Sequence, residues 1–182
     1  MNRLECCTME LFVGLDFPPE VIHELERVQR MLRLLDPSAH YEPADNYHLT
    51  LRYIGEASDD ESIVQRLERI RGERFRLTLQ ELGIFENADW NVVWVNVREE
   101  PCLLALKDKI DRMLTDAGDR IELYPFNPHI SLAYYGRPGI SDEFSTCPVA
   151  PLPFEVSSFH LYAVDHSPDG PRFRKVRAFK LT

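Results

Sequence analysis

The chain has 182 residues and a net charge of −9. This acidity argues against a protein that wraps long nucleic acid with a broad basic surface, but it leaves room for a nucleotide or a short nucleic-acid end. The four cysteines form no CxxC pair and no apolar run approaches the ~18 residues of a membrane helix, so we expect a cytoplasmic protein with reduced thiols.

The first half of the chain predicts two pairs of strand and helix. An apolar, β-prone segment over 10–17 favours a strand, and apolar residues at helical spacing then favour a helix from Pro18-Pro19 to Asp36-Pro37. A second strand is expected over 49–54. The acidic residues at 59–61 mark the start of a second helix, because negative charge stabilises a helix N-terminus.

The second half repeats this order of strand, helix opened by proline, and strand with a histidine motif. Pro101 opens the helix, and strands are expected at 75–79, 92–97, 129–135, 158–164 and 173–181. We interpret the shared order as a structural duplication in an α+β fold, with antiparallel sheets and helices packed on one side. A bilobal domain over 9–182 with two pseudo-symmetric lobes is expected, after a disordered extension over 1–8.

Two short segments share one pattern of histidine, aliphatic, hydroxyl and aliphatic residues. They are His48-Leu49-Thr50-Leu51 and His129-Ile130-Ser131-Leu132. Because side chains alternate along a strand, each histidine shares a face with its hydroxyl residue while the aliphatic residues anchor the strand from behind. One such histidine is usually structural, but a matched pair in corresponding places of two similar halves favours a functional site.

The paired histidines predict general acid–base chemistry, with His48 and His129 as the catalytic residues. Opening a cyclic phosphate needs a base that takes a proton from water and an acid that protonates the departing ribose oxygen, and histidine serves both roles near neutral pH. The hydroxyls of Thr50 and Ser131 are expected to donate hydrogen bonds to the phosphate oxygens, where charge accumulates.

Metal binding is the weaker interpretation of the same residues. Two histidines fall short of a catalytic zinc site, which usually has three protein ligands, and no nearby carboxylate has ligand spacing. We therefore expect neither a metal nor a cofactor.

The chain resembles the two-histidine (2H) phosphoesterases, and within them the bacterial and archaeal RNA 2′,3′-cyclic phosphodiesterases, also called 2′-5′ RNA ligases. The resemblance runs from about Glu10 to Leu181. Its order and spacing are carried by Leu11–Asp16, Pro43–Leu51 with its Asn46-Tyr47-His48, Val92–Val95, Pro125–Leu132, Leu161-Tyr162 and Gly170–Phe173.

This resemblance implies a bilobal α+β fold whose two motifs face each other across a central cleft. It also implies metal-independent hydrolysis of 2′,3′-cyclic phosphate ends to 2′-phosphates, with reverse 2′-5′ RNA ligation as a side activity. By the family pattern His48 would be the acid at the leaving 3′ oxygen, and His129 would be the base that activates water.

One departure from the family pattern concerns arginine. The second motif is usually His-x-Thr-x-x-Arg, whereas Tyr134 stands at the arginine position here and Arg137 follows. Strand alternation places Arg52 on the face of His48 and Thr50, so we expect Arg52 either to bind the phosphate in its place or to be an exposed charge at a strand end.

The rings of Phe126 and Tyr135 are candidates for base stacking, with packing in the core as the commoner alternative for such residues. The expected partner is an RNA end or a nucleotide bearing a 2′,3′-cyclic phosphate, and the protein is expected to be a monomer. Two alternatives stay open: an enzyme of the same mechanism acting on another cyclic phosphate or a 2′-5′ linked oligonucleotide, and a non-catalytic module that binds RNA ends.

Overall fold

The computed structural model describes residues 8–86, 91–115, 125–135, 143–144, 146–168 and 170–182. The extension expected at the N-terminus therefore lies almost wholly outside the described residues. The expected α+β class with antiparallel sheets is confirmed, since every strand pairing in this part of the chain is antiparallel.

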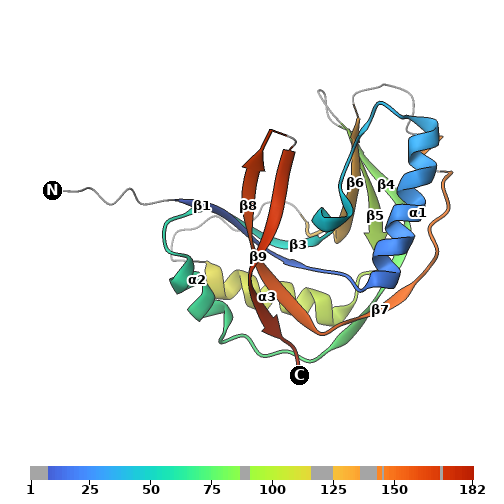
Figure 1. The fold of residues 1–182 in the computed structure, drawn as a ribbon. Coiled ribbons are helices and arrows are strands. Elements are labelled where there is room, and N and C mark those ends of the chain that lie inside the picture. Colours follow the sequence, from blue (N-terminus) through green and yellow to red (C-terminus); the bar gives the residue numbers. More distant parts are fainter. Residues whose placement is uncertain (1–7, 87–90, 116–124, 136–142, 145, 169) are drawn as a thin grey trace.

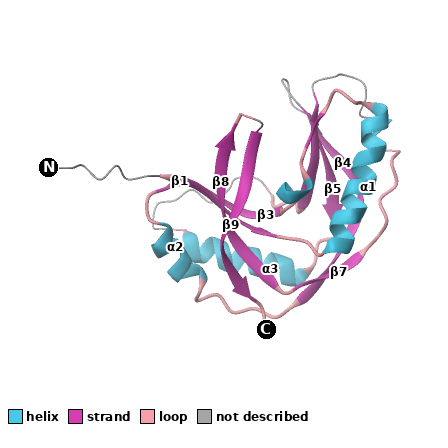
Figure 2. Cartoon of the chain, in the orientation of Figure 1, coloured by secondary structure: helices cyan, strands magenta, loops and turns pink. Residues whose placement is uncertain are grey.

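The described strands form two sheets (Figures 1 and 2). The first sheet has the order β3-β1-β8-β9 and is built from β1 (Met9–Leu15), β3 (Leu49–Ala57), β8 (Ser158–Ser167) and β9 (Gly170–Lys180). The second sheet has the order β2-β6-β5-β4-β7 and is built from β2 (His40–Tyr41), β4 (Phe75–Glu86), β5 (Asn91–Val97), β6 (His129–Tyr135) and β7 (Pro153–Val156).

Helices cover the two sheets separately. The described helices are α1 (Pro19–Leu35), α2 (Asp60–Leu67), α3 (Pro101–Leu114) and the short 3-10 helix η1 (Ala44–Asn46). Helix α1 packs against β6 of the second sheet, whereas α3 packs against β3 of the first and against α2 (Figure 1). Buried residues from both sheets and the three α-helices form one hydrophobic cluster, so the two halves share a core.

The starts of the helices follow the local sequence. Proline occupies the first turn of α1 and of α3, where its missing N–H is not needed. The Asp59 side chain caps α2 by accepting a hydrogen bond from the Ser62 N–H at 3.0 Å. None of the helices in the described part of the chain is long and apolar enough to span a membrane.

Several strands are longer than the sequence predicts, among them β3, β4, β8 and β9. Strand β3 continues through Gly55 to Ala57, because Gly55 adopts a φ of +84° at a register shift against β1 and so marks a bulge instead of the end of the strand. Strand β4 continues past Leu79 to Glu86. The short edge strands β2 and β7 were not expected.

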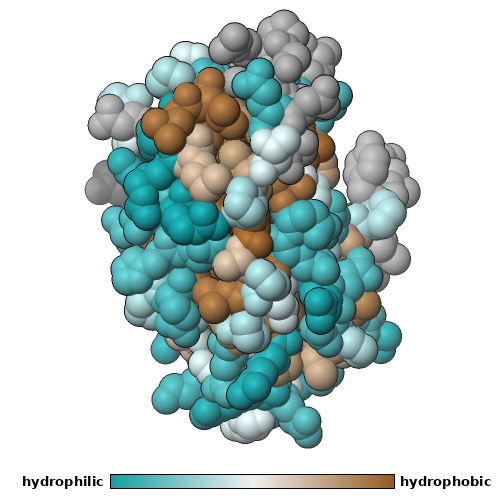
Figure 3. Space-filling model, turned by 90° about the vertical axis from the view of Figure 1, so that its right-hand side faces the viewer, coloured by the Kyte–Doolittle hydropathy of each residue, from teal (hydrophilic) through white to brown (hydrophobic). Residues whose placement is uncertain are grey.

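The face over α1 is mostly hydrophilic, with apolar side chains gathered in limited patches (Figure 3). This view looks at the right-hand side of Figure 1, where α1 lies on the outside of the second sheet. The arrangement fits an amphipathic helix, since α1 buries Val21, Leu25, Val28 and Leu32 toward the sheet.

Candidate active site

The first motif lies at the start of β3 and follows the expected alternation. Leu49 and Leu51 are fully or almost fully buried in the core, whereas His48 and Thr50 are partly exposed. The aliphatic residues therefore anchor the strand and leave the imidazole and the hydroxyl together on its other face.

Hydrogen bonds fix the ring of His48 on both sides. Its Nδ1 lies 2.7 Å from the carbonyl oxygen of Asn46, and its Nε2 lies 3.1 Å from the hydroxyl oxygen of Thr50. A carbonyl only accepts, so Nδ1 carries the hydrogen, and in the neutral ring Nε2 has the lone pair and accepts from Thr50. His48 thus holds a nitrogen ready to take or return a proton.

Aromatic rings enclose His48. The centroids of Phe12 in β1 and Phe173 in β9 each lie 4.7 Å from the imidazole centroid. The pKa of His48 is lowered to about 4, chiefly because burial among these rings disfavours the charged form; the bond to Asn46 opposes this shift, and the charge of His129 adds to it.

The second motif repeats this local geometry at the start of β6. Ile130 and Leu132 are fully buried, and His129 Nδ1 lies 2.7 Å from the carbonyl oxygen of Asn127. The rings of Phe85 and Trp94 lie 5.0 and 5.7 Å from the imidazole, and burial lowers the pKa of His129. Both histidines therefore present Nε2 as the acceptor nitrogen when neutral.

The two motif strands come together although 81 positions separate their histidines. Strand β3 contacts β6 across the junction of the two sheets, and the charge of His129 reaches His48 strongly enough to contribute to its lowered pKa. Asparagine stands two residues before each histidine, as Asn46 and Asn127, and supplies the orienting carbonyl. This shared Asn-x-His spacing is visible in the sequence, but its role was missed.

A bulge at the last residue of each motif ends the alternation. In β3 the pairing with β1 jumps from Thr50 to Arg52, and in β6 the pairing with β5 jumps from Ser131 to Ala133. The extra residue at each site is the second aliphatic residue of the motif. Residues beyond each bulge therefore change faces relative to a regular strand.

The bulge in β3 corrects the expected placement of Arg52. Its guanidinium lies 3.6 Å from the carboxylate of Asp111 in α3, which also binds Lys107 at 2.7 Å. Arg52 therefore packs toward the helix that covers the first sheet, whereas regular alternation would have put it beside His48 and Thr50.

The bulge in β6 decides which of two adjacent tyrosines shares the face of the second motif. Tyr135 is 3% exposed and packs edge-on against Phe144, so its ring is part of the core and not open to a base. The phenol of Tyr134 instead has hydrogen-bonding contacts with Ser131 and with Glu42, and its pKa is raised mainly by burial. Tyr134 thus shares the face of the second motif.

Phe126 is the remaining candidate for base stacking. It is partly buried against the core, three residues before His129, and the ammonium of Lys107 lies 5.6 Å from its ring centroid. Its exposed part stays available, so the stacking role remains a prediction.

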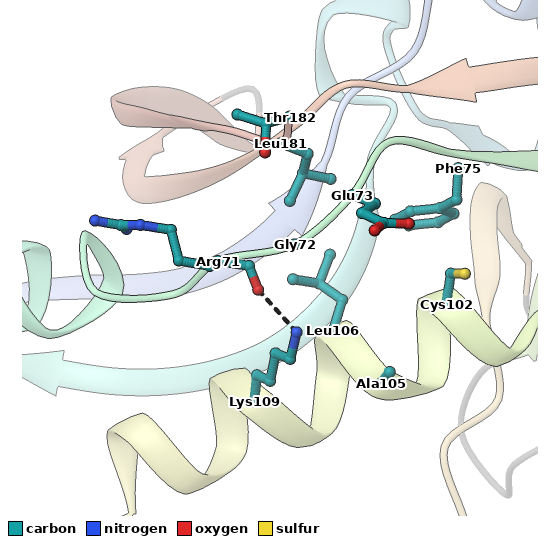
Figure 4. Close-up of a pocket in the computed structure, with 10 residues that line it drawn as sticks. All are labelled: Arg71, Gly72, Glu73, Phe75, Cys102, Ala105, Leu106, Lys109, Leu181 and Thr182. Carbon is teal, nitrogen blue, oxygen red and sulfur yellow. Dashed lines mark hydrogen bonds between the residues drawn. The ribbon is translucent and has the colours of Figure 1, made fainter.

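Two pockets differ in their relation to the motifs. One of about 210 Å³ lies beside His48, and its lining includes Asp16, Tyr162, Phe173 and Lys175. A second, of about 420 Å³, lies between α3 and the C-terminus and contains no residue of either motif (Figure 4). There Lys109 Nζ donates to the carbonyl of Arg71 at 2.7 Å. Of these two pockets only the smaller touches a motif residue, His48, and neither is lined by Thr50, His129 or Ser131.

Among the described residues, no group of three or more His, Cys, Asp or Glu side chains is arranged so that it could hold a metal ion. The residues that the described structure brings together are two imidazoles, two hydroxyls and Tyr134. Such a set can exchange protons and donate hydrogen bonds to an anion.

Comparison with known proteins gives concordant matches. A model of the 2′-5′ RNA ligase superfamily matches residues 17–168. The RNA 2′,3′-cyclic phosphodiesterase of Aeropyrum pernix is 40% identical over 58% of this chain and 66% of that protein. The RNA 2′,3′-cyclic phosphodiesterase of Escherichia coli is 27% identical over 94% of this chain and 96% of that protein. The crystal structure of E. coli LigT complexed with 3′-AMP has a TM-score of 0.78 and 26% identity, covering 97% of this chain and 99% of that chain.

Proposed function

Because the chain belongs to the 2′-5′ RNA ligase superfamily, we propose that it is an RNA 2′,3′-cyclic phosphodiesterase that uses His48 and His129 as an acid–base pair. The observation that carries the proposal is the matched orientation of the two rings. Each gives its Nδ1 hydrogen to a carbonyl two residues earlier at 2.7 Å, which leaves Nε2 for proton transfer.

The proposed reaction is an in-line displacement at phosphorus. His129 Nε2 takes a proton from water as the water oxygen bonds to phosphorus, and the bond from phosphorus to the 3′ oxygen breaks. His48, in its protonated form, gives its Nε2 proton to that oxygen, and the product is a 2′-phosphate. Bound cyclic phosphate is an anion and stabilises imidazolium, so it raises the pKa of His48 above its value in the free enzyme.

The hydroxyls of Thr50 and Ser131 are the proposed phosphate contacts. Thr50 already lies 3.1 Å from His48 Nε2, so a phosphate that displaces this bond meets both groups at once. Hydrogen bonds aimed at the phosphate oxygens stabilise the charge that develops there. No metal is needed for these steps, and reverse 2′-5′ ligation would run through the same pair with the proton roles exchanged.

A nucleotide or a short RNA end is the proposed substrate. The pocket of about 210 Å³ beside His48 has room for part of a nucleoside, and the crystal structure with 3′-AMP shows that a relative of the same fold binds a nucleotide. The acidic balance of −9 gives no support for a long track along RNA.

The test is turnover of 2′,3′-cyclic nucleotide monophosphates in the presence of EDTA. We expect activity that survives chelation and falls by at least about 100-fold in His48→Ala and in His129→Ala, since each loses one proton-transfer group. The matched control His23→Ala removes a histidine from α1 and should keep wild-type turnover.

Each alternative predicts a different result. Loss of activity on chelation would contradict the metal-free mechanism, and binding without turnover of any cyclic phosphate would favour an RNA-end-binding module. The position of the product phosphate tests the leaving group, because a 3′-phosphate would reverse the assignment of the departing oxygen.

A further inference from the structure

Glu42 is a buried carboxyl between the two motifs that the proposed mechanism does not use. It lies between β2 and η1 and is only 6% exposed. Burying a carboxyl group costs free energy unless hydrogen bonds compensate, so the partners of this side chain show which groups it holds.

The backbone of Glu42 is fixed to the second motif. Strand β2 pairs with β6, and the Glu42 N–H continues this pairing by donating to the carbonyl of Leu132 at 2.9 Å. The side chain of Gln29 in α1 closes the junction, because its Nε2 donates to the carbonyl of Glu42 at 2.6 Å and to that of Leu132 at 3.1 Å. Glu42 is therefore fixed opposite Leu132, the residue that follows Ser131 in β6.

The side chain of Glu42 reaches toward the first motif. Its Oε2 accepts a hydrogen bond from Asn46 Nδ2 at 3.0 Å. The same Nδ2 donates to the carbonyl of Pro171 at 2.8 Å, and Asn46 Oδ1 accepts from the N–H of Phe173 at 3.3 Å. Asn46 is thus held by Glu42 on one side and by β9 on the other.

Asn46 in turn orients His48. Its carbonyl accepts the Nδ1 hydrogen of His48 at 2.7 Å, and Phe173, whose N–H it binds, packs edge-on against the same imidazole at 4.7 Å. A second connection leads back to the other motif, because the Glu42 carboxyl also has a hydrogen-bonding contact with Tyr134, which contacts Ser131.

We propose that Glu42 is a positioning residue, which locks His48 through Asn46 in the orientation that turns Nε2 toward Thr50 and ties this orientation to the strand of His129. The inference rests on the proposed function for its effect on turnover, although the orientation of His48 can be observed without any substrate. A misplacement of about 1 Å in reacting groups can cost about 100-fold in rate, so the link has catalytic weight without touching substrate.

The experiment compares Glu42→Gln with wild type in turnover and in the tautomer of His48. Gln keeps the size and one acceptor oxygen but brings an NH₂ group against Asn46 and Tyr134. We expect kcat to fall about 10–100-fold with KM changed less than about threefold. Nitrogen-15 NMR should show the Nδ1–H form of His48 in wild type and a mixture with the Nε2–H form in the variant.

Two further variants complete the design. Asn46→Ala breaks the same link at Asn46 and replaces Glu42→Gln in the test if that variant does not fold. Because both substitutions break one link, the double variant should lose less than about threefold more kcat than Glu42→Gln alone. Glu155→Gln removes the same charge from an exposed position on β7 and should leave both readouts unchanged.

Normal kcat and an unchanged His48 tautomer in Glu42→Gln, or in Asn46→Ala if only that variant folds, would overturn the inference. If wild type turns over no cyclic phosphate, the proposed function fails, but a tautomer shift in the variant would still support the positioning role. If wild type is active and the variant changes neither readout, only the positioning role fails.

Discussion

At the scale of single residues, the site depends on two imidazoles whose charged forms are disfavoured. Phe12 and Phe173 surround His48, and Phe85 and Trp94 pack against His129. The rings shield the histidines from water. The backbone carbonyls of Asn46 and Asn127 accept the Nδ1 hydrogens and so leave Nε2 as the nitrogen that can exchange a proton. Burial thus lowers the pKa of each histidine, and the backbone carbonyl sets the orientation of its ring.

The depressed pKa values make a prediction for the pH profile. In the proposed mechanism turnover needs His48 charged and His129 neutral, and the product of these two fractions is largest midway between the two pKa values. The pKa of His48 is about 4 and that of His129 lies below its usual 6.5, so we expect kcat/KM to be highest below pH 6.5 and to fall as the pH rises further. Bound phosphate raises both values, so the optimum of kcat should lie at higher pH. Steady-state kinetics from pH 4 to 9 measure both profiles, and a kcat/KM that rises from pH 6.5 to 8 would contradict the prediction.

Arg52 gives a second prediction at this scale. The bulge after Thr50 turns its side chain to Asp111, so we expect Arg52→Ala to leave kcat/KM within about threefold of wild type. Stability should fall by about 1 kcal/mol, since a half-buried ion pair and its packing are lost. Urea unfolding and turnover of a cyclic mononucleotide measure the two effects. A loss of more than tenfold in kcat/KM would show that the guanidinium does bind the phosphate.

At the scale of the elements, the position of His129 depends on a close approach between β4 and β5. A Cβ atom at Gly83 would overlap the ring of Trp94, which stacks on Phe85 at 4.8 Å and lies next to His129. We expect Gly83→Ala to displace this ring, to cost about 1–3 kcal/mol in the free energy of unfolding and to lower kcat/KM about tenfold.

Gly72→Ala is the matched control for that substitution. Its Cβ would approach only the end of the Leu181 side chain, at 3.0 Å and in the pocket beside α3. Wild-type turnover is expected in this variant. If the folded Gly83→Ala variant keeps full activity, the aromatic wall does not position His129.

Local sequence predicts much of these elements. Proline and apolar spacing locate α1 and α3, and alternation correctly places His48 with Thr50 and His129 with Ser131 on one face. The bulges at Leu51 and Leu132 were not predictable, because they arise from pairing with β1 and β5 and not from the motif itself. This is why alternation misplaced Arg52, and why it could not show that Tyr134, and not Tyr135, shares the face of the second motif.

The contacts of Glu42 were beyond local reasoning for a similar reason. They join α1, β2, η1 and β6 through Gln29, Asn46 and Leu132, and β2 is too short to leave a pattern in the sequence. A tyrosine at the position of the family arginine also becomes intelligible only in three dimensions, where its phenol contacts the buried Glu42 carboxyl.

At the scale of the whole molecule, the negative balance limits how RNA is bound. The net charge is −9, and the proposed contacts reach a single cyclic phosphate that carries one negative charge. The salt dependence of binding grows with the number of phosphates neutralised, with a slope of roughly −0.7 per phosphate for single strands.

We therefore expect a shallow salt dependence for substrates of any length. A log–log plot of kcat/KM against NaCl concentration should have a slope between about −0.7 and −1.4, corresponding to one or two phosphates. A 20-nucleotide RNA with a 2′,3′-cyclic phosphate end should show nearly the same slope as the cyclic mononucleotide, because the net charge of −9 disfavours contact with further phosphates. The same RNA with a 3′-hydroxyl end should be a poor competitive inhibitor. A much steeper slope for the long RNA, near −4, would instead reveal a basic track that guides the strand to His48 and His129 despite the acidic whole.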